Sequence, residues 1–192
     1  MIFIDLFAIV FFILLAPIPL FFGLFQFHPN FFKRFGYWNY VVVLNIYILM
    51  TIATLKFLPI FIILRYSLPW FLVIVGGILT LAGICIAAVA GRHLSFATLI
   101  ALPQIHPQHF PSKCITTGIY HFMRHPRYVG CWLIAFGLAL ATGFLALWEL
   151  LFWTVIGFST MAYLEEKELQ KRFGKEYTEY MQRVPTFIPK IF

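Results

Sequence analysis

Residues 128–164 read YVGCWLIAFGLALATGFLALWELLFWTVIGFSTMAYL, a run of 37 residues whose only charged side chain is Glu149. An α-helix rises about 1.5 Å per residue, so this run is roughly twice as long as a bilayer core about 30 Å thick. Folding it back on itself keeps its apolar residues within one membrane. The sequence therefore predicts a transmembrane helical hairpin that turns near Thr142 and Gly143.

The remainder of the chain is almost as apolar as this stretch. Of its 192 residues, 62% are hydrophobic and 11% are charged, and the mean hydropathy is +0.90. Further apolar runs cover residues 2–27, in which Pro17 and Pro19 predict a kink, and residues 38–55 and 70–90. They lack the alternating pattern of a membrane β-barrel, which leaves helices that satisfy their own backbone. We therefore expect an all-α integral membrane protein with about five transmembrane helices.

These runs define the expected organisation of the chain. We interpret residues 1–192 as one membrane domain. Residues 1–90 form three transmembrane helices, and residues 91–127, which hold five of the six histidines, form a cytosolic loop. Residues 128–164 form the hairpin. Residues 165–192 are polar and form a cytosolic tail, helical at its start, that completes a cofactor pocket with the loop.

Small residues predict where helices pack and where they end. Gly83, Ala87 and Gly91 recur every fourth residue, a spacing that lets two membrane helices approach closely. Gly174 follows a polar helical stretch and is expected to end it as a C-cap. After the second apolar run, residues 57–64 either extend that helix or lie at the membrane interface.

The distribution of basic residues predicts the orientation of the helices. If five spans alternate, 12 of the 14 lysines and arginines fall on one side and 2 on the other. The positive-inside rule then puts the loop and the carboxyl-terminal tail in the cytosol and the amino terminus outside. The same distribution accounts for the net charge of +7, so nucleic acid is not an expected partner.

Two polar clusters flank the hairpin, one at each cytosolic end. The first is residues 118–130, GIYHFMRHPRYVG, and the second is Glu165 with Glu166. Pro126 suits the first turn of a helix. Free N–H groups in that turn, together with Arg124 and Arg127, favour an anion such as a carboxylate or a phosphate. Because the hairpin doubles back, we expect both clusters to meet in a charged pocket at the membrane face.

Glu165 and Glu166 have no basic residue four positions later, and they stand where the last helix leaves the bilayer. Unpaired acids are costly there unless a cation binds them, so a cationic ligand with an attached carboxylate would suit both clusters. Two plainer interpretations stay open: the arginines anchor the helix to headgroups, and the acids are solvated. His106 and His109 have neighbouring prolines and no further ligands, so no metal site is expected.

The residues of both clusters carry a resemblance to a known family. The run RHPRYVG (residues 124–130), preceded by GIY (residues 118–120) and followed by the acidic pair and FGKEY (residues 173–177), resembles the isoprenylcysteine carboxyl methyltransferase and phospholipid methyltransferase superfamily. The resemblance covers about the last 80 residues; the first 90 match only as membrane helices. It implies S-adenosylmethionine as cofactor at the cytosolic membrane face and a lipid or lipidated acceptor.

The resemblance also implies which residues form the site. Arg124 and Glu166 are the implied catalytic residues. Arg124 and the helix N-terminus suit the methionyl carboxylate, either glutamate suits the ammonium group or the ribose hydroxyls, and Tyr128 suits the sulfonium. The implied cofactor-binding residues are Gly118, Tyr120, Arg124, His125, Tyr128, Gly130, Glu165 and Glu166.

Two other functions fit the same sequence. Membrane sterol reductases that use NADPH resemble this family over the same carboxyl-terminal region, although they are generally larger. A helical membrane scaffold or lipid carrier without enzymatic activity would use the polar clusters only as headgroup anchors. The acceptor is left open between an isoprenylcysteine carboxylate-like and a phospholipid amine-like amphiphile, and we expect residues 1–90 to decide it.

Overall fold

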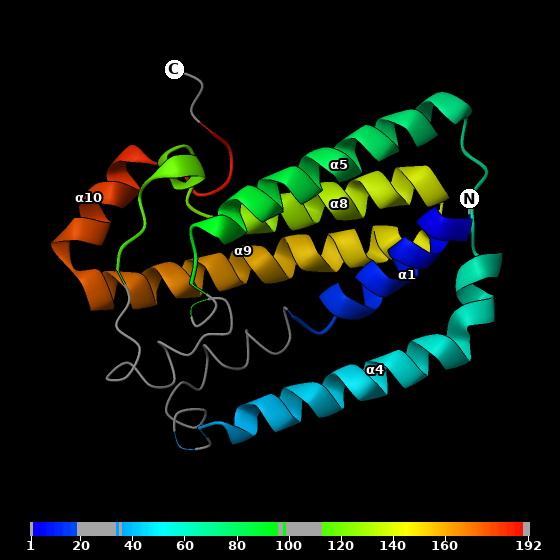
Figure 1. The fold of residues 1–192 in the computed structure, drawn as a ribbon, viewed down its shortest axis with the longest axis horizontal. Helices are drawn as coiled ribbons and strands as arrows, with labels where there is room; N and C mark the ends of the chain where they lie inside the picture. The colour runs from blue at the N-terminus through cyan, green and yellow to red at the C-terminus, as the bar shows by residue number, and fades with distance from the viewer. Residues whose placement is uncertain (1, 19–33, 35, 96–97, 99–112, 190–192) are drawn as a thin grey trace.

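The computed structural model describes residues 2–18, 34, 36–95, 98 and 113–189. Within these ranges no strand occurs, so the predicted all-α fold is confirmed for them. Three of the helices, α5, α8 and α9, lie side by side, and α10 lies at one end of this bundle (Figure 1). The helical elements are α1 (Ile2–Leu15), α4 (Trp38–Ile63), α5 (Trp70–Arg92), the 3-10 helix η1 (Gly118–His121), α8 (Pro126–Thr142), α9 (Leu145–Phe173) and α10 (Lys175–Arg183).

Three of the described helices, α4, α5 and α9, are long and apolar enough to cross a membrane. α1 and α8 are shorter apolar helices. Large hydrophobic side chains are exposed on α1, α4, α5 and α9, and Leu49 of α4 and Leu81 of α5 are each more than 60% exposed. A surface of this kind fits lipid rather than water, and the chain is an integral membrane protein. The number of spans beyond these three and the sides on which the termini lie stay predictions.

The hairpin turns where the sequence predicts. α8 ends at Thr142 and α9 begins at Leu145, with Gly143 between them at a φ of 74°. A Cβ at Gly143 would lie 2.1 Å from the carbonyl oxygen of Tyr66. Only glycine combines this backbone conformation with so close an approach, so the chain turns here and α9 runs back along α8.

α5 and α8 pack closely and run antiparallel (Figure 1). Gly76 faces Gly137 and Gly83 faces Gly130, and a Cβ on any of the four would come within 2.5 to 2.9 Å of the opposite carbonyl oxygen. The predicted stripe of small residues makes this contact through Gly83, whereas a Cβ at Gly91 would meet nothing within 4 Å. Glycines therefore let the two backbones touch, which fixes α8 against α5.

Two predicted spans differ from the helices observed. α1 ends at Leu15, because Pro17 lacks an N–H and disfavours helix in the residue before it. The predicted kink falls at this break, and the remainder of the span predicted over residues 2–27, from residue 19 onward, lies outside the described residues. α4 continues to Ile63, so of the two alternatives for residues 57–64 the extended helix is correct.

The end of the molecule that holds the hairpin turn, here named the turn end, is joined by a few polar contacts. The backbone N–H of Tyr66 donates to the carbonyl of Gly143 over 2.9 Å. Arg65 pairs with Asp5 over 3.3 Å, and its guanidinium lies 5.3 Å from the centroid of the Phe144 ring. These contacts join the start of α1 and the α4–α5 link to the hairpin turn.

Candidate functional site

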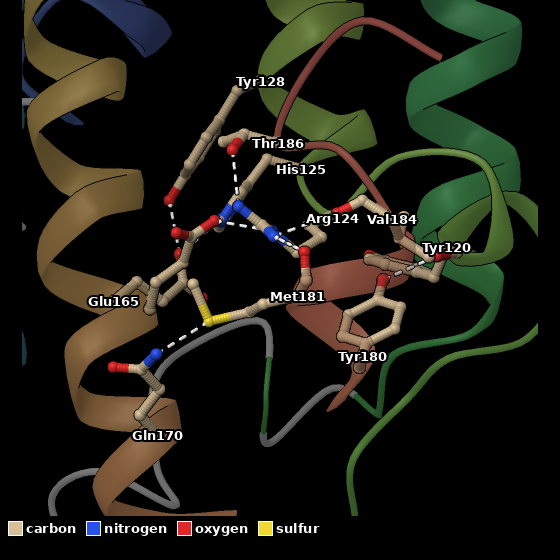
Figure 2. A network of polar contacts seen from close by, with 11 residues as sticks. Tyr120, Arg124, His125, Tyr128, Glu165, Gln170, Tyr180, Met181, Val184 and Thr186 are labelled. Carbon is tan, nitrogen blue, oxygen red and sulfur yellow. Dashed lines mark hydrogen bonds and ion pairs between the residues drawn. The ribbon is translucent and has the colours of Figure 1, made fainter. Parts of the chain in front are cut away.

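The opposite end of the hairpin, named the site end, gathers both polar clusters. α8 begins with Pro126 in its first turn. α9 continues beyond the apolar run, which ends at residue 164, as far as Phe173. Figure 2 shows Arg124, His125 and Tyr128 turned toward the α9 glutamates. The structure therefore brings together the two clusters that the sequence separates by about forty residues.

Arg124 is the most heavily hydrogen-bonded side chain of this site (Figure 2). Its Nε donates to Oε1 of Glu166 over 2.8 Å. Its Nη1 donates to the carbonyls of Met181 and Val184 over 2.8 and 2.9 Å, and its Nη2 donates to Oγ1 of Thr186 over 2.6 Å. Nearly all N–H donors of the guanidinium are in use, so Arg124 ties the tail to α9.

The backbone of the tail adds to this connection. The N–H of Arg124 donates to the carbonyl of Pro185 over 2.9 Å, and the N–H of His125 donates to the carbonyl of Thr186 over 3.0 Å. The tail thus runs alongside the residues that precede α8.

His125 and Tyr128 partner the two glutamates from α8. His125 Nε2 lies 3.2 Å from Oε1 of Glu166, and its Nδ1 lies 3.7 Å from Oε2 of Glu165. The hydroxyl of Tyr128 donates to Oε2 of Glu165 over 2.9 Å. These two acids, which have no basic residue four positions later on their own helix, therefore find partners across the hairpin. His125 and Glu166 are each only 8% exposed, which leaves this part of the network buried.

Aromatic rings continue from this network toward the middle of the bundle. The rings of His125 and Tyr128 are stacked, with centroids 5.3 Å apart, and Tyr128 stacks in turn on Phe158 at 4.7 Å. Trp132 lies one helical turn after Tyr128 and packs on Phe187 of the tail at 4.8 Å. Ring faces carry partial negative charge, so this is an environment that favours a nearby cation.

A cavity of about 480 Å³ opens beside the network. A volume of this size is within the usual range for a site that holds a cofactor or a drug-sized ligand. Its walls come from the end of α5, the segment before η1, the first turn of α8, the last turns of α9, and α10. The residues that line it include His93, Lys113, Cys114, Tyr120, Arg124, His125, Arg127, Tyr128, Glu165, Leu169, Arg172, Phe173, Tyr177 and Tyr180.

The charges around the cavity are of both signs. Lys113 and Arg127 line it, and neither has a hydrogen-bond or ion-pair partner in the described part of the chain. Arg172 also lines it, but it pairs with Glu168 on its own helix. Of the described lining residues, Glu165 is the one that contributes a carboxylate. The cavity thus has basic groups ready for an anion and one acid already hydrogen-bonded to a phenol.

Three tyrosines form the wall opposite Glu165. The hydroxyl of Tyr180 donates to the carbonyl of Tyr120 over 2.6 Å, which fixes α10 to η1. Burial raises the pKa of Tyr120 to about 12, although the nearby charge of Arg127 acts in the opposite direction. Burial likewise raises the pKa values of Tyr177 and Tyr180. All three phenols therefore stay protonated near neutral pH and act as neutral donors and ring surfaces.

The predicted site residues fall into two groups in space. Five of the eight line the cavity: Tyr120, Arg124, His125, Tyr128 and Glu165. The other three lie behind its wall. Glu166 is buried and accepts a hydrogen bond from Arg124. Gly118 lies against the His93 ring, and a Cβ at Gly118 would come within 2.3 Å of His93 Nε2. Gly130 packs against α5. The predicted roles of all eight remain predictions.

The structure also reveals cavity residues that the sequence did not single out. His93 stands at the end of α5 and Lys113 in the loop, with no motif to mark either. Tyr177 belongs to the FGKEY run of the family resemblance, which assigned it no role, and Tyr180 follows three residues later on α10, a spacing that puts both on one helix face. The histidine pair His106 and His109 lies outside the described residues.

Comparison with known families gives one match. The family model described as phospholipid methyltransferase matches residues 71–176, which include α5, α8, α9 and the start of α10. These are the elements whose ends surround the cavity. No solved structure matches the chain significantly.

The curated relatives are also named as methyltransferases. The chain is 39% identical over 80 residues to a protein-S-isoprenylcysteine O-methyltransferase of Schizosaccharomyces pombe, covering 40% of this chain and 33% of the relative. It is 32% identical over 103 residues to protein-S-isoprenylcysteine O-methyltransferase B of Arabidopsis thaliana, covering 52% and 48%. It is 35% identical over 86 residues to a methanethiol S-methyltransferase of Crocosphaera subtropica, covering 44% and 32%. The chain thus spans a third to about half of the length of these relatives.

Proposed function

Because this chain belongs to the phospholipid methyltransferase family, we propose that it is a membrane methyltransferase that uses S-adenosylmethionine to methylate a lipid-like acceptor. The observation that carries the proposal is the cavity at the site end. It combines unpartnered cations, a carboxylate and aromatic rings within the segment that the family model covers. Family membership alone would not suffice, because function depends on the chemistry of the site.

The described residues fit the chemical groups of this cofactor. Lys113 and Arg127 suit the methionyl carboxylate, since neither is engaged elsewhere in the described chain. Glu165 suits the ammonium group or the ribose hydroxyls, because a carboxylate can accept more than the one hydrogen bond it receives from Tyr128. Tyr177 and its neighbouring rings offer faces for the adenine.

Arg124 and Glu166 act through position in this proposal. Arg124 already uses most of its donors on Glu166 and the tail, and Glu166 lies outside the cavity lining. Glu166 also lies 3.2 Å from His125 Nε2, and the His125 ring stacks on Tyr128, so the pair supports these two rings from outside the cavity. We therefore assign to Arg124 and Glu166 the support of the cavity wall rather than contact with the reacting atoms.

The chain's own contribution to catalysis is alignment and the exclusion of water. When bound, the cofactor supplies an electrophilic methyl group on a sulfonium. The stacked rings of His125 and Tyr128 line the cavity, with Phe158 stacked behind Tyr128, and their faces would stabilise the positive charge. Holding two reactants in line in a water-poor site supplies much of the acceleration that such a displacement needs.

The acceptor should reach this wall from the membrane. We propose an amphiphile whose nucleophile lies at headgroup level, either a carboxylate like that of an isoprenylcysteine or an amine like that of a phospholipid. We further propose that the site end faces the cytosol, as the basic residues predict. Fusion of a reporter to the carboxyl terminus checks the orientation, and activity of the reporter outside the cell would refute it.

The direct test incubates the purified protein in vesicles with S-adenosylmethionine carrying a labelled methyl group. We expect label in an N-acetyl-S-farnesylcysteine or phosphatidylethanolamine fraction, and a higher melting temperature in the presence of S-adenosylmethionine. A rise in melting temperature with NADPH alone would refute the methyltransferase and favour a reductase. Unchanged melting temperatures with both cofactors, together with no labelled lipid, would refute an enzymatic function.

A further inference from the structure

Trp132 has a buried hydrogen-bond donor without a partner. Its indole Nε1 is inaccessible to solvent, and no described residue accepts a hydrogen bond from it. A buried N–H without an acceptor costs free energy, and the cost is greatest in surroundings of low dielectric constant. Trp132 belongs to α8, within the apolar hairpin, so water is not a ready substitute.

The position of Trp132 connects it to the cavity. It follows Tyr128 by four residues, which puts both side chains on the same face of α8. Tyr128 lines the cavity, and Phe158 of α9 contacts both rings, at 4.7 Å from Tyr128 and 6.5 Å from Trp132. The unpartnered N–H is therefore one helical turn deeper in the membrane than the cavity wall.

The tail covers this position from the other side. Phe187 packs on Trp132 at 4.8 Å and lies 5.9 Å from the His125 ring. Unlike Phe158, Phe187 is not part of a membrane helix, because α10 ends at Arg183 and residues 184–189 form no helix. Of the two rings that pack on Trp132, Phe187 is therefore the one whose side chain can turn aside without the shift of a helix.

We propose that the indole N–H of Trp132 donates a hydrogen bond to an oxygen of the methyl acceptor. This inference rests on the proposed methyltransferase function and adds a specificity residue to it. The acceptor displaces Phe187, lies on the membrane side of Tyr128, and presents a carbonyl or carboxylate oxygen to Nε1. Its nucleophile then meets the cavity at the Tyr128 wall. An acceptor without such an oxygen leaves the donor unpaired and binds less well.

The test compares two probes with the same hydrocarbon tail. N-acetyl-S-farnesylcysteine carries carboxylate and amide oxygens, whereas S-farnesylcysteamine has the same thioether and no oxygen. Binding of each probe to the intact protein in detergent is measured by calorimetry, without any requirement for turnover. The variant Trp132→Phe keeps an aromatic ring and removes the N–H. Trp153→Phe, at a residue of α9 that is 65% exposed, is the matched control.

We expect Trp132→Phe to raise the Kd of N-acetyl-S-farnesylcysteine about tenfold and that of S-farnesylcysteamine less than twofold. Trp153→Phe should change neither value. An equal loss for both probes would show that only the shape of the ring matters, and no loss for either would show that Nε1 does not meet the acceptor. Both results would overturn the proposal, as would wild-type protein that binds the two probes equally well.

The affinity for S-adenosylmethionine, measured on the same samples, separates this inference from the proposed function. We expect wild type and Trp132→Phe to bind the cofactor equally. If wild type fails to bind S-adenosylmethionine, the methyltransferase proposal fails, whatever the two probes show. If cofactor binding is intact and the probe selectivity is absent, only the role of Trp132 fails.

Discussion

The two ends of the helical bundle are each closed by an arginine, and the two closures differ in kind. At the site end, Arg124 makes four side-chain hydrogen bonds. Its side chain is 9% exposed, and the side chain of its partner Glu166 is 11% exposed. At the turn end, Arg65 makes one ion pair over 3.3 Å, and its side chain and that of Asp5 are both about a quarter exposed. The site end depends on a buried polar network, whereas the turn end depends on backbone fit at Gly143.

The contacts that position the cavity residues therefore lie at the site end, and those that fix the hairpin turn lie at the turn end. A buried arginine surrounded by oxygens holds three segments in one arrangement: α9, the residues before α8, and the tail. A partly exposed pair such as Arg65 with Asp5 is weakened by solvent and contributes little. Substitutions at the two ends should therefore have very different effects, and they can be ranked.

The largest effect should come from Arg124→Ala. Removing one partner of a buried ion pair leaves Glu166 unpaired and frees the tail, which costs about 3 kcal/mol or more. We expect the melting temperature in detergent to fall by about 6 °C or more and S-adenosylmethionine binding to be lost. Arg124→Lys keeps the charge but not the geometry of the guanidinium, so it should rescue little. A variant as stable as wild type would show that the network does not hold the site end.

The next effect should come from Gly143→Ala at the turn end. Gly143 has a positive φ of 74°, and a Cβ there would lie 2.1 Å from the Tyr66 carbonyl oxygen, whereas a Cβ at Gly77 within α5 would meet nothing within 4 Å. We expect Gly143→Ala to lower the free energy of unfolding by about 2 kcal/mol or more relative to Gly77→Ala, because alanine at Gly77 meets neither backbone strain nor a close contact. Chemical denaturation measures the difference. Equal losses would show that the turn tolerates the added carbon.

A third substitution, Glu165→Gln, tests the site end without breaking its network. Glu165 is 30% exposed and accepts from Tyr128, whereas Arg124 and His125 are bound to Glu166. We expect about a tenfold loss of S-adenosylmethionine affinity with a melting temperature close to that of wild type. Glu179→Gln, on α10 and paired with the exposed Lys175, is the control and should leave the affinity unchanged, because neither residue lines the cavity. An unaltered affinity in Glu165→Gln would remove this residue from the cofactor site.

The contrast between the ends also explains how far the sequence could be interpreted. Residues 128–164 are long, apolar and nearly free of charge, so bilayer thickness alone predicts the hairpin and its turn at Gly143. The meeting of the two polar clusters follows from that hairpin without further information. The helical stretch from Glu165 to Phe173 and its end at Gly174 are likewise local properties of the chain.

What the sequence could not supply was the choice of partners in three dimensions. Arg124 was interpreted as a ligand for a carboxylate, but the tail folds back and occupies most of its donors. Gly130 was assigned to the cofactor through a motif, whereas the structure uses it for contact with α5. Neither outcome is visible in spacing, because both depend on segments more than forty residues away along the chain.

The smallest effect should come from Asp5→Asn at the turn end. The substitution keeps the shape of the side chain and removes the charge that Arg65 faces, and Arg65 retains its contact with the Phe144 ring. For an ion pair this exposed we expect a loss of about 0.5 kcal/mol, seen as a fall in melting temperature of no more than about 2 °C. Affinity for S-adenosylmethionine should not change, because the contact is at the opposite end of the bundle from the cavity (Figure 1). A loss of stability as large as that of Arg124→Ala would show that the two ion pairs stabilise the fold equally, and the distinction drawn between the site end and the turn end would then be wrong.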